Sequence, residues 1–253
     1  MRLFGLLGYP LGHSFSAGFF AENFQAERQS QQMDYQNFAL ENVELMMDVI
    51  KQNPNLEGFN ITIPYKEQII PFLDDIDAGA KAIGAVNCVT IKGGKLKGYN
   101  TDAYGFENSL LKLIEGADKA TLKALVLGTG GASKAIKYVL TKNGIEFKSI
   151  SRDNTKADFS YDELTSEVIK AHQLIINTTP LGTYPNNHTY PAIPYEGIAE
   201  GHYLFDVVYN PALTKFLELG ENNGAKVLNG SRMLVDQAYK SWEIWGLEPQ
   251  SLK

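Results

Sequence analysis

Residues 125–140 read LVLGTGGASKAIKYVL, and this stretch decides the fold. It continues an apolar run that starts at Leu122 and stops at Gly128, a pattern typical of a strand buried in a parallel sheet. The residues after the glycines have the spacing of a helix that ends near Lys142. Strand, tight turn and helix in this order predict a βα unit of a dinucleotide-binding domain, in which the amides at the helix N-terminus face a pyrophosphate.

The glycines let a ligand approach the backbone, but they do not complete the strict G-x-G-x-x-G pattern. Gly128 permits the turn, Gly130 and Gly131 open the backbone, and Ser133 stands at the third position. A glycine turn alone is also compatible with a plain loop. The strand before it, the helix after it and a second strand that ends at Ser151 favour a cofactor site over that alternative.

The tip of this second strand bears on the choice of cofactor. An NAD site usually carries an Asp or Glu there for the ribose hydroxyls, whereas an Arg suits the 2′-phosphate of NADP. Here Ser151 and Arg152 come first and Lys156 adds a second positive charge, while Asp153 favours NAD. A solvated loop is the structural alternative. We predict NADP, with NAD as the alternative cofactor.

The rest of the chain alternates strand and helix patterns. Strands are expected at Leu3–Leu7, Tyr35–Leu40, Leu56–Ile63, Val86–Ile91, Lys95–Tyr99, Phe147–Ser151, Leu174–Asn177, Tyr203–Val208 and Lys226–Leu228. Helices are expected at Ser14–Arg28, Val43–Gln52, Lys66–Leu73, Ala78–Ile83, Phe106–Ile114, Tyr161–Ala171, Thr214–Asn222 and Met233–Trp245. Repeated βα units imply parallel sheets, so the sequence predicts an α/β fold of two domains with a cleft between them.

The composition is that of a globular protein without a basic surface. The 253 residues are 44% hydrophobic and 21% charged, with a formal net charge of -6, so we predict no nucleic-acid partner. The single cysteine, Cys88, excludes an intrachain disulfide and a multi-cysteine metal site, and no metal is predicted. No run approaches the roughly 20 apolar residues of a membrane span, and glycine and proline interrupt the apolar N-terminus. We predict a cytoplasmic protein.

Polar side chains follow several strands in the first half of the chain. Ser14 and Ser16 follow the first strand, and the third strand brings Asn60 and Thr62, with Lys66 just beyond it. Each polar group also has a structural alternative, such as a helix cap or a turn. In open α/β sheets, however, ligands bind beyond the carboxyl ends of the strands. The shared location of these groups therefore predicts a site for a small polyhydroxylated acid.

Seven motifs together resemble those of the shikimate dehydrogenase family: GYPLGHSFS, GFNITIPYK, IGAVNCV, GYNTDAYGF, LGTGGASKA, DVVYNPALT and NGSRMLVDQAYKSWEIWG. They occur in the family's order and extend from residue 8 to residue 246. The resemblance implies NADP-dependent reduction of 3-dehydroshikimate to shikimate, by a monomer or a homodimer. It also implies a substrate-binding domain of residues 1–101 plus 231–253 and an NADP-binding Rossmann-like domain of residues 102–230.

The resemblance further assigns roles to matching positions. Lys66 and Asp102 would form the catalytic pair, in which Asp102 holds the lysine in place. The substrate-binding positions are Ser14, Ser16, Asn60, Thr62, Asn87, Tyr209 and Gln237. The cofactor-binding positions are Gly128, Gly130, Gly131, Ala132, Ser151, Arg152 and Lys156. One alternative is a family member that oxidises quinate or an amino analogue with NAD. Another is a non-catalytic ligand sensor, which the presence of both catalytic residues disfavours.

Three positions depart from the family's usual pattern. Ala17 stands where the family has a proline, and Thr179-Pro180-Leu181-Gly182 replaces Thr-Ser-x-Gly. Asp153 replaces a threonine in the cofactor loop, which bears on the grip on a 2′-phosphate. None of these changes affects Lys66 or Asp102.

Overall fold

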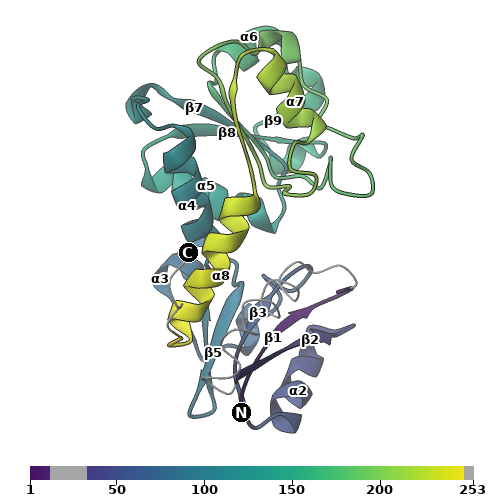
Figure 1. The fold of residues 1–253 in the computed structure, drawn as a ribbon, viewed down its shortest axis with the longest axis vertical. Coiled ribbons are helices and arrows are strands. Elements are labelled where there is room, and N and C mark those ends of the chain that lie inside the picture. The colour runs from purple at the N-terminus through teal and green to yellow at the C-terminus, as the bar shows by residue number, and fades with distance from the viewer. Residues whose placement is uncertain (12–32, 248–253) are drawn as a thin grey trace. The chain divides into compact units, whose positions relative to one another are not determined.

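The computed structural model describes residues 1–11 and 33–247, except for the side chain of Asn154. The chain forms two compact units, Met1–Thr101 with Ala238–Lys253, and Asp102–Gln237 (Figure 1). Each unit is built on a six-stranded sheet with helices, which confirms the predicted α/β fold. No helix of the described part is long and apolar enough to cross a membrane.

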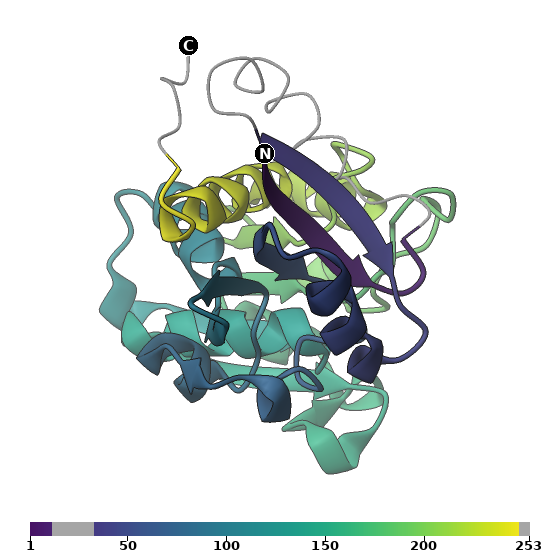
Figure 2. The same cartoon turned by 90° about the horizontal axis from the view of Figure 1, so that it is seen from below.

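The sheet of the first unit is mixed, with the strand order β2-β1-β3-β5-β6-β4. Its strands are β1 (Arg2–Gly8), β2 (Met33–Ala39), β3 (Leu56–Ile61), β4 (Asp75–Ile76), β5 (Cys88–Lys92) and β6 (Lys95–Tyr99). Strand β1 runs parallel to both β2 and β3, and Figure 2 shows β1 and β2 side by side in purple. Strands β5 and β6, which correspond to the strands expected at 86–91 and 95–99, form an antiparallel hairpin. Its two-residue turn, Gly93 and Gly94, has φ of 57° and 75°, which glycine adopts without steric cost.

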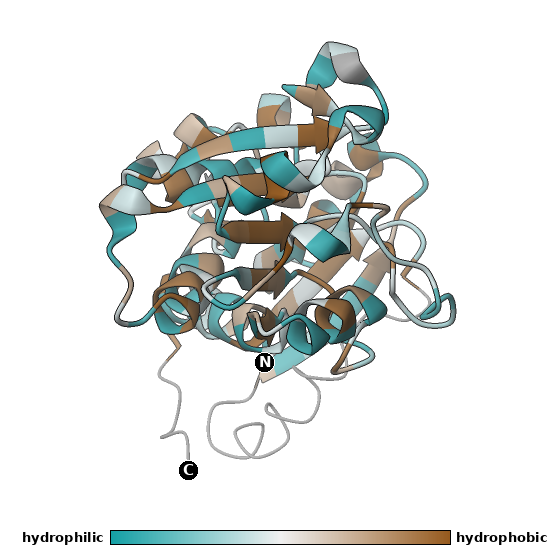
Figure 3. Cartoon of the chain, turned by 90° about the horizontal axis from the view of Figure 1, so that it is seen from above, coloured by the Kyte–Doolittle hydropathy of each residue, from teal (hydrophilic) through white to brown (hydrophobic). Residues whose placement is uncertain are grey.

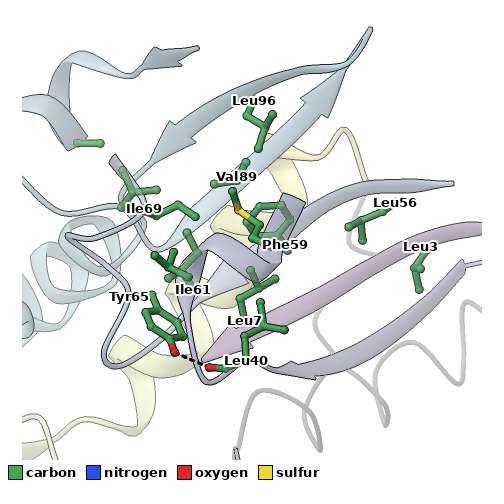
Figure 4. Packing of buried hydrophobic residues seen from close by; sticks show 14 residues of the cluster. Leu3, Leu7, Leu40, Leu56, Phe59, Ile61, Tyr65, Ile69, Val89 and Leu96 are labelled. Carbon is green, nitrogen blue, oxygen red and sulfur yellow. Dashed lines mark hydrogen bonds between the residues drawn. The ribbon is translucent and has the colours of Figure 1, made fainter. Parts of the chain in front are cut away.

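The hydrophobic core of the first unit includes residues of β1, of β3 and of the segment after β3. Strand β3 buries Leu56, Phe59 and Ile61, which pack with side chains from β1 and with Tyr65 and Ile69 (Figure 4). Among the described residues before residue 101, the remaining elements are α2 (Met46–Gln52), α3 (Ala78–Ile83) and the 3₁₀ turns η1 (Val43–Leu45) and η2 (Ile70–Phe72).

The sheet of the second unit is entirely parallel, in the order β12-β11-β10-β7-β8-β9. Its strands are β7 (Lys123–Leu127), β8 (Glu146–Ser151), β9 (Phe159–Ser160), β10 (Leu174–Asn177), β11 (Tyr203–Asp206) and β12 (Lys226–Asn229). Its helices are α4 (Asp102–Leu113), α5 (Gly131–Lys142), α6 (Ser166–Lys170) and α7 (Lys215–Asn222). Its 3₁₀ turns are η3 (Lys119–Thr121), η4 (Asn154–Lys156), η5 (Tyr161–Glu163) and η6 (Tyr195–Gly197).

Helices cover both faces of this parallel sheet. Helices α4 and α5 lie on one side and α6 and α7 on the other (Figure 1). The central strands are therefore buried on both faces, and Figure 3 shows their hydrophobic (brown) colouring, whereas the helices alternate between brown and teal. This two-sided burial is the physical reason for the continuous apolar run at 124–127, which follows the exposed Lys123.

The last helix, α8 (Ser231–Ile244), belongs in part to each unit, because the division falls between Gln237 and Ala238. The sequence-based division placed the return to the first domain at residue 231. The first turns of α8 instead pack on α4, where a Cβ on Gly105 would lie 2.3 Å from the Met233 carbonyl oxygen. The Asn108 side chain also donates to the carboxylate of Asp236 over 3.2 Å.

Two predicted helices differ in the structure. Residues 66–73 form a series of turns ending in η2 rather than an α-helix, and Pro71, which has no backbone N–H to donate, lies within them. The helix expected at 161–171 is divided into η5 and α6, because the Thr165 hydroxyl accepts from the Val168 N–H and caps a new helix that begins at Ser166. The helix expected at 14–28 lies outside the described residues.

Candidate functional site

Lys66 lies on a turn that is anchored on both sides by buried residues. Before it, the Tyr65 side chain is 3% exposed and its hydroxyl donates to the Leu40 carbonyl (Figure 4). After it, Ile69 is fully buried and its backbone N–H donates to the Tyr65 carbonyl over 3.0 Å. The carbonyl of Lys66 itself accepts from the Val86 N–H over 2.7 Å. The turn therefore holds a half-buried lysine at a defined place beyond β3.

Two of the predicted substrate-binding amides are brought together beside this turn. Asn60 lies in β3 and Asn87 directly precedes β5, and both are buried. The Asn60 side-chain nitrogen donates to the Asn87 carbonyl oxygen over 3.2 Å. Thr62 follows the last residue of β3 and is half-buried, and its N–H donates to Leu7 of β1 over 2.9 Å. Ser14 and Ser16 lie outside the described residues.

Asp102 and Gln237 lie in helices of the second unit. Asp102 is the first residue of α4 and is buried, where its negative charge is favourable to the helix macrodipole. Gln237 is a buried residue of α8, and its side-chain nitrogen donates to the Leu234 carbonyl over 3.0 Å.

The glycine turn forms a cradle at the start of α5. Gly128 has φ of 109°, and a Cβ there would lie 2.6 Å from the Thr178 hydroxyl oxygen. Gly130 is the N-cap of α5 and contributes no side-chain cap, and a Cβ added to it would meet no described atom within 4 Å. The space beside Gly130 at the N-terminus of α5 is thus open, as a phosphate site requires. Gly131 and Ala132 follow as the first residues of α5. Ser133 closes the turn, since its hydroxyl donates to the Gly130 carbonyl over 2.6 Å.

The loop beyond β8 carries the remaining cofactor-binding positions. Ser151 ends β8, and its hydroxyl oxygen accepts from the Asp153 N–H over 3.2 Å. Asp153 accepts hydrogen bonds from the hydroxyl and N–H of Thr155, and Lys156 forms an ion pair with it at 3.1 Å. The hydrogen bonds from Thr155 and Lys156 hold the pKa of the Asp153 carboxyl below its usual value. The Lys156 charge is therefore shared with an acid, and Arg152 is exposed.

A buried carboxylate supports the loop that carries Tyr209. Asp206 ends β11 and is fully buried, and Tyr209 is half-buried three residues later. One carboxylate oxygen accepts from the Val208 N–H and from the Asn177 amide, each over 3.0 Å. The other accepts from the Thr214 hydroxyl over 2.6 Å. The carboxylate thus joins the ends of β10 and β11 to the start of α7.

Known proteins resemble this chain in sequence. The family model of the shikimate dehydrogenase substrate binding domain matches residues 6–89. A shikimate dehydrogenase (NADP(+)) from Carboxydothermus hydrogenoformans is 37% identical over 270 residues, covering 98% of this chain and 93% of that protein. The chain belongs to the shikimate dehydrogenase family.

Solved structures of shikimate dehydrogenase relatives match along almost the whole chain. Shikimate 5-dehydrogenase from Thermus thermophilus, in complex with NADP(H) and shikimate, has a TM-score of 0.83 and 31% identity, covering 99% of this chain and 95% of that one. Quinate dehydrogenase from Corynebacterium glutamicum, in complex with NAD, has a TM-score of 0.87 and 26% identity, covering 98% and 95%. The two-domain α/β fold expected from the family resemblance is confirmed.

Sequence reasoning about the shikimate dehydrogenase motifs missed several buried polar residues. Asn177, Asp206 and Thr214 lie in or beside the quoted motifs but were assigned no role. Thr101 and Ser241, which are fully buried, were likewise passed over. A polar residue within an otherwise apolar strand end or helix face was the available signal, because buried polar groups are nearly always hydrogen-bonded.

Replacing Asp206 with asparagine tests the charge of this buried carboxyl. Burial raises its pKa to about 6, above the unfolded value. The protonated Asp206 carboxyl therefore contributes its full share to the free energy of unfolding below about pH 4, and this contribution is lost as pH rises through 6. Relative to Asp206→Asn, the wild type should lose about 3 kcal/mol of unfolding free energy between pH 4 and 7. Urea unfolding at several pH values measures this, and a pH-independent difference between the two proteins would contradict it.

Gly130→Ala tests whether the cradle is a cofactor site in this shikimate dehydrogenase relative. The backbone of Gly130 has φ of -78° and its Cβ would meet no described protein atom, so the melting temperature should not change. A methyl group there would obstruct the approach of a pyrophosphate, and the KM for the cofactor should rise by roughly tenfold or more, the effect of about 1.4 kcal/mol. Gly128→Ala is the contrasting variant, because its positive φ and the contact with Thr178 should also lower the melting temperature. If Gly130→Ala left the KM for the cofactor unchanged, the cradle would not be the cofactor-binding site.

Proposed function

We propose that this protein catalyses the reversible NADPH-dependent reduction of 3-dehydroshikimate to shikimate. The observation that carries the proposal is the full-length similarity to shikimate dehydrogenases, together with a lysine held on the anchored turn beyond β3. The open cradle at Gly130 and the exposed Arg152 fit the pyrophosphate and the 2′-phosphate of the cofactor.

Lys66 and Asp102 are the proposed catalytic pair. Bound NADPH supplies the hydride, and reduction builds negative charge on the carbonyl oxygen of the substrate. The Lys66 ammonium donates a proton or a strong hydrogen bond to that oxygen, which stabilises the charge as it develops. Asp102 accepts a hydrogen bond from a neighbouring hydroxyl of the substrate.

The other proposed roles follow the family positions. Ser14, Ser16, Asn60, Thr62, Asn87, Tyr209 and Gln237 bind the substrate. Gly128, Gly130, Gly131, Ala132, Ser151, Arg152 and Lys156 bind NADP. The substrate-binding domain is assigned to the first unit and the NADP-binding domain to the second. We assign the protein to the cytoplasm as a monomer or homodimer, and the single cysteine supports a reducing compartment.

A spectrophotometric assay of shikimate oxidation tests the function. Purified protein is incubated with shikimate or quinate and with NADP or NAD, and the reduced nicotinamide that forms is followed by its ultraviolet absorbance. The highest kcat/KM is expected for shikimate with NADP. The second candidate is a quinate dehydrogenase that uses NAD, which the match to the Corynebacterium glutamicum enzyme and the presence of Asp153 both favour. A higher kcat/KM for quinate with NAD would establish that candidate instead.

The Asp153–Lys156 ion pair makes a specific prediction about cofactor preference. Asp153→Thr removes the acid that shares the Lys156 charge, so that this ammonium interacts fully with a 2′-phosphate. The KM for NADP should fall by roughly fivefold, as expected for exposed charges, while the KM for NAD stays the same or rises. Asp162→Thr removes another exposed acid of the same unit and serves as the control. If both variants change the NADP KM equally, the effect is one of net charge, and the assignment of Lys156 to the 2′-phosphate is wrong.

A further inference from the structure

Four polar side chains of the first unit form a buried group, here called the buried amide cluster: Asn60, Asn87, Thr101 and Ser241. Asn60 donates to the Ser241 hydroxyl oxygen over 2.9 Å, and Asn87 donates to the Thr101 hydroxyl oxygen over 2.9 Å. The two hydroxyl oxygens are 3.4 Å apart. The cluster therefore connects four separate segments: β3, the residue before β5, the end of the β5–β6 hairpin and α8.

The partners determine which way each amide faces. The Thr101 N–H, which can only donate, lies 2.6 Å from Oδ1 of Asn87, so that atom is the oxygen. The Asn87 carbonyl, which can only accept, faces Nδ2 of Asn60. Oδ1 of Asn60 in turn accepts from the Tyr35 hydroxyl over 3.1 Å. Rotating the Asn87 amide would set donor against donor, and rotating the Asn60 amide would set its oxygen against the Asn87 carbonyl oxygen; either clash in a buried place is costly.

Ser241 and Thr101 are the hydroxyl members of the cluster, and neither reaches the surface. Both side chains are 0% exposed, so neither hydroxyl touches a ligand directly. Ser241 also hydrogen-bonds Cys88, whose burial raises its thiol pKa to about 12 and keeps the sulfur neutral. Thr101 immediately precedes Asp102 in the chain. Any effect of the two hydroxyls on substrate therefore passes through their neighbours.

We propose that Ser241 and Thr101 are positioning residues for substrate binding, which hold the amides of Asn60 and Asn87 in one orientation. The inference rests on the proposed function, because it assumes that Asn87 contacts the substrate. Both amide hydrogens of Asn60 are donated to Asn87 and Ser241, so any contact of Asn60 with the substrate is made by its amide oxygen, which can accept a second hydrogen bond. The C-terminal helix thus contributes to substrate recognition through a residue that never meets the substrate.

Ser241→Ala tests the proposal, with Ser109→Ala as the matched control. Ser109 is an equally buried helical serine whose hydroxyl donates to the Gly105 carbonyl of its own helix over 3.0 Å. Ser241→Ala should raise the KM for shikimate by roughly three- to tenfold, the effect of one lost hydrogen bond, and leave the cofactor KM unchanged. It should also reduce the rise in melting temperature that saturating shikimate produces. Ser109→Ala should change neither quantity.

A second pair of variants keeps the test decisive if Ser241→Ala does not fold. Thr101→Val removes the hydroxyl and should raise the shikimate KM, whereas Thr101→Ser keeps the hydroxyl and should restore a KM close to that of the wild type. A shikimate KM within about twofold of wild type in both Ser241→Ala and Thr101→Val would overturn the inference. If the wild type itself oxidises no shikimate and gains no stability from it, the proposed function has failed instead.

Discussion

Lys66→Ala is expected to lower kcat for shikimate oxidation by roughly 100- to 10,000-fold, the range that a positioned acid or base contributes. The KM for shikimate should change far less, because the interaction with the substrate oxygen becomes strong only as charge develops in the transition state. The turn that carries Lys66 is anchored by Tyr65, Ile69 and the backbone bond to Val86, none of which the substitution removes. The protein should therefore fold normally, as circular dichroism and thermal melting would show.

Lys81→Ala is the control for the Lys66 variant. Lys81 is an exposed lysine of α3 in the same unit, so its replacement removes the same charge from the protein without touching the anchored turn. Its kcat should equal that of the wild type. A Lys66→Ala protein that keeps a near-wild-type kcat would falsify the assignment of Lys66 as the proton donor.

Asp102→Asn is expected to give the second largest effect, a fall in kcat of roughly 100-fold or more. Asparagine keeps the shape of the side chain and removes its negative charge. Because Asp102 starts α4, the loss of a favourable interaction with the helix dipole should also cost about 0.3–1 kcal/mol of stability. Asp118→Asn is the control, because it removes the charge of an exposed acid that caps η3. It should leave kcat unchanged, so a fall in kcat in Asp102→Asn alone is a catalytic effect and not the effect of a lost charge at a cap.

The double variant shows whether the two residues act as a unit. If Lys66 and Asp102 serve one proton-handling step, combining Lys66→Ala with Asp102→Asn should lower kcat little more than the stronger single change does. Rate losses that multiply would show that the residues act independently. The comparison requires kcat for the wild type, both single variants and the double variant under the same conditions.

Local sequence patterns predicted the elements whose cause is local. The apolar run at 122–127 became a buried parallel strand, and Gly93-Gly94 became the turn of a hairpin. The strand orders were not predicted, since they depend on contacts between residues far apart in the chain. The turns at 66–69 were predicted as a helix, because Tyr65, Ile69 and Ile70 have a spacing that fits an α-helix as well as a series of turns.

The residues of the candidate site that lie within short motifs were predicted, whereas the residues that only tertiary contacts bring to the site were missed. Lys66 and the glycine cradle are visible in the sequence as short motifs. The partners of Asn60 lie 181 residues away at Ser241 and 25 residues away at Tyr35, and no local pattern connects them. A buried amide takes its partners from whatever the tertiary fold places beside it, which the order of residues alone does not state.

Residues near the C-terminus complete the core of the unit that is synthesised first. Trp245 stacks on Phe4 with ring centroids 4.7 Å apart, and its indole N–H donates to the Val89 carbonyl over 3.0 Å. Phe4, Met33 and Cys88 share a buried cluster with Ala238, Trp242, Trp245 and Leu247. The unit that begins first on the ribosome is therefore the last to acquire its full core. The unit at 102–237 is continuous and has all its residues before α8 is finished, so a nascent chain holds an unfilled N-terminal sheet until Trp245 has emerged.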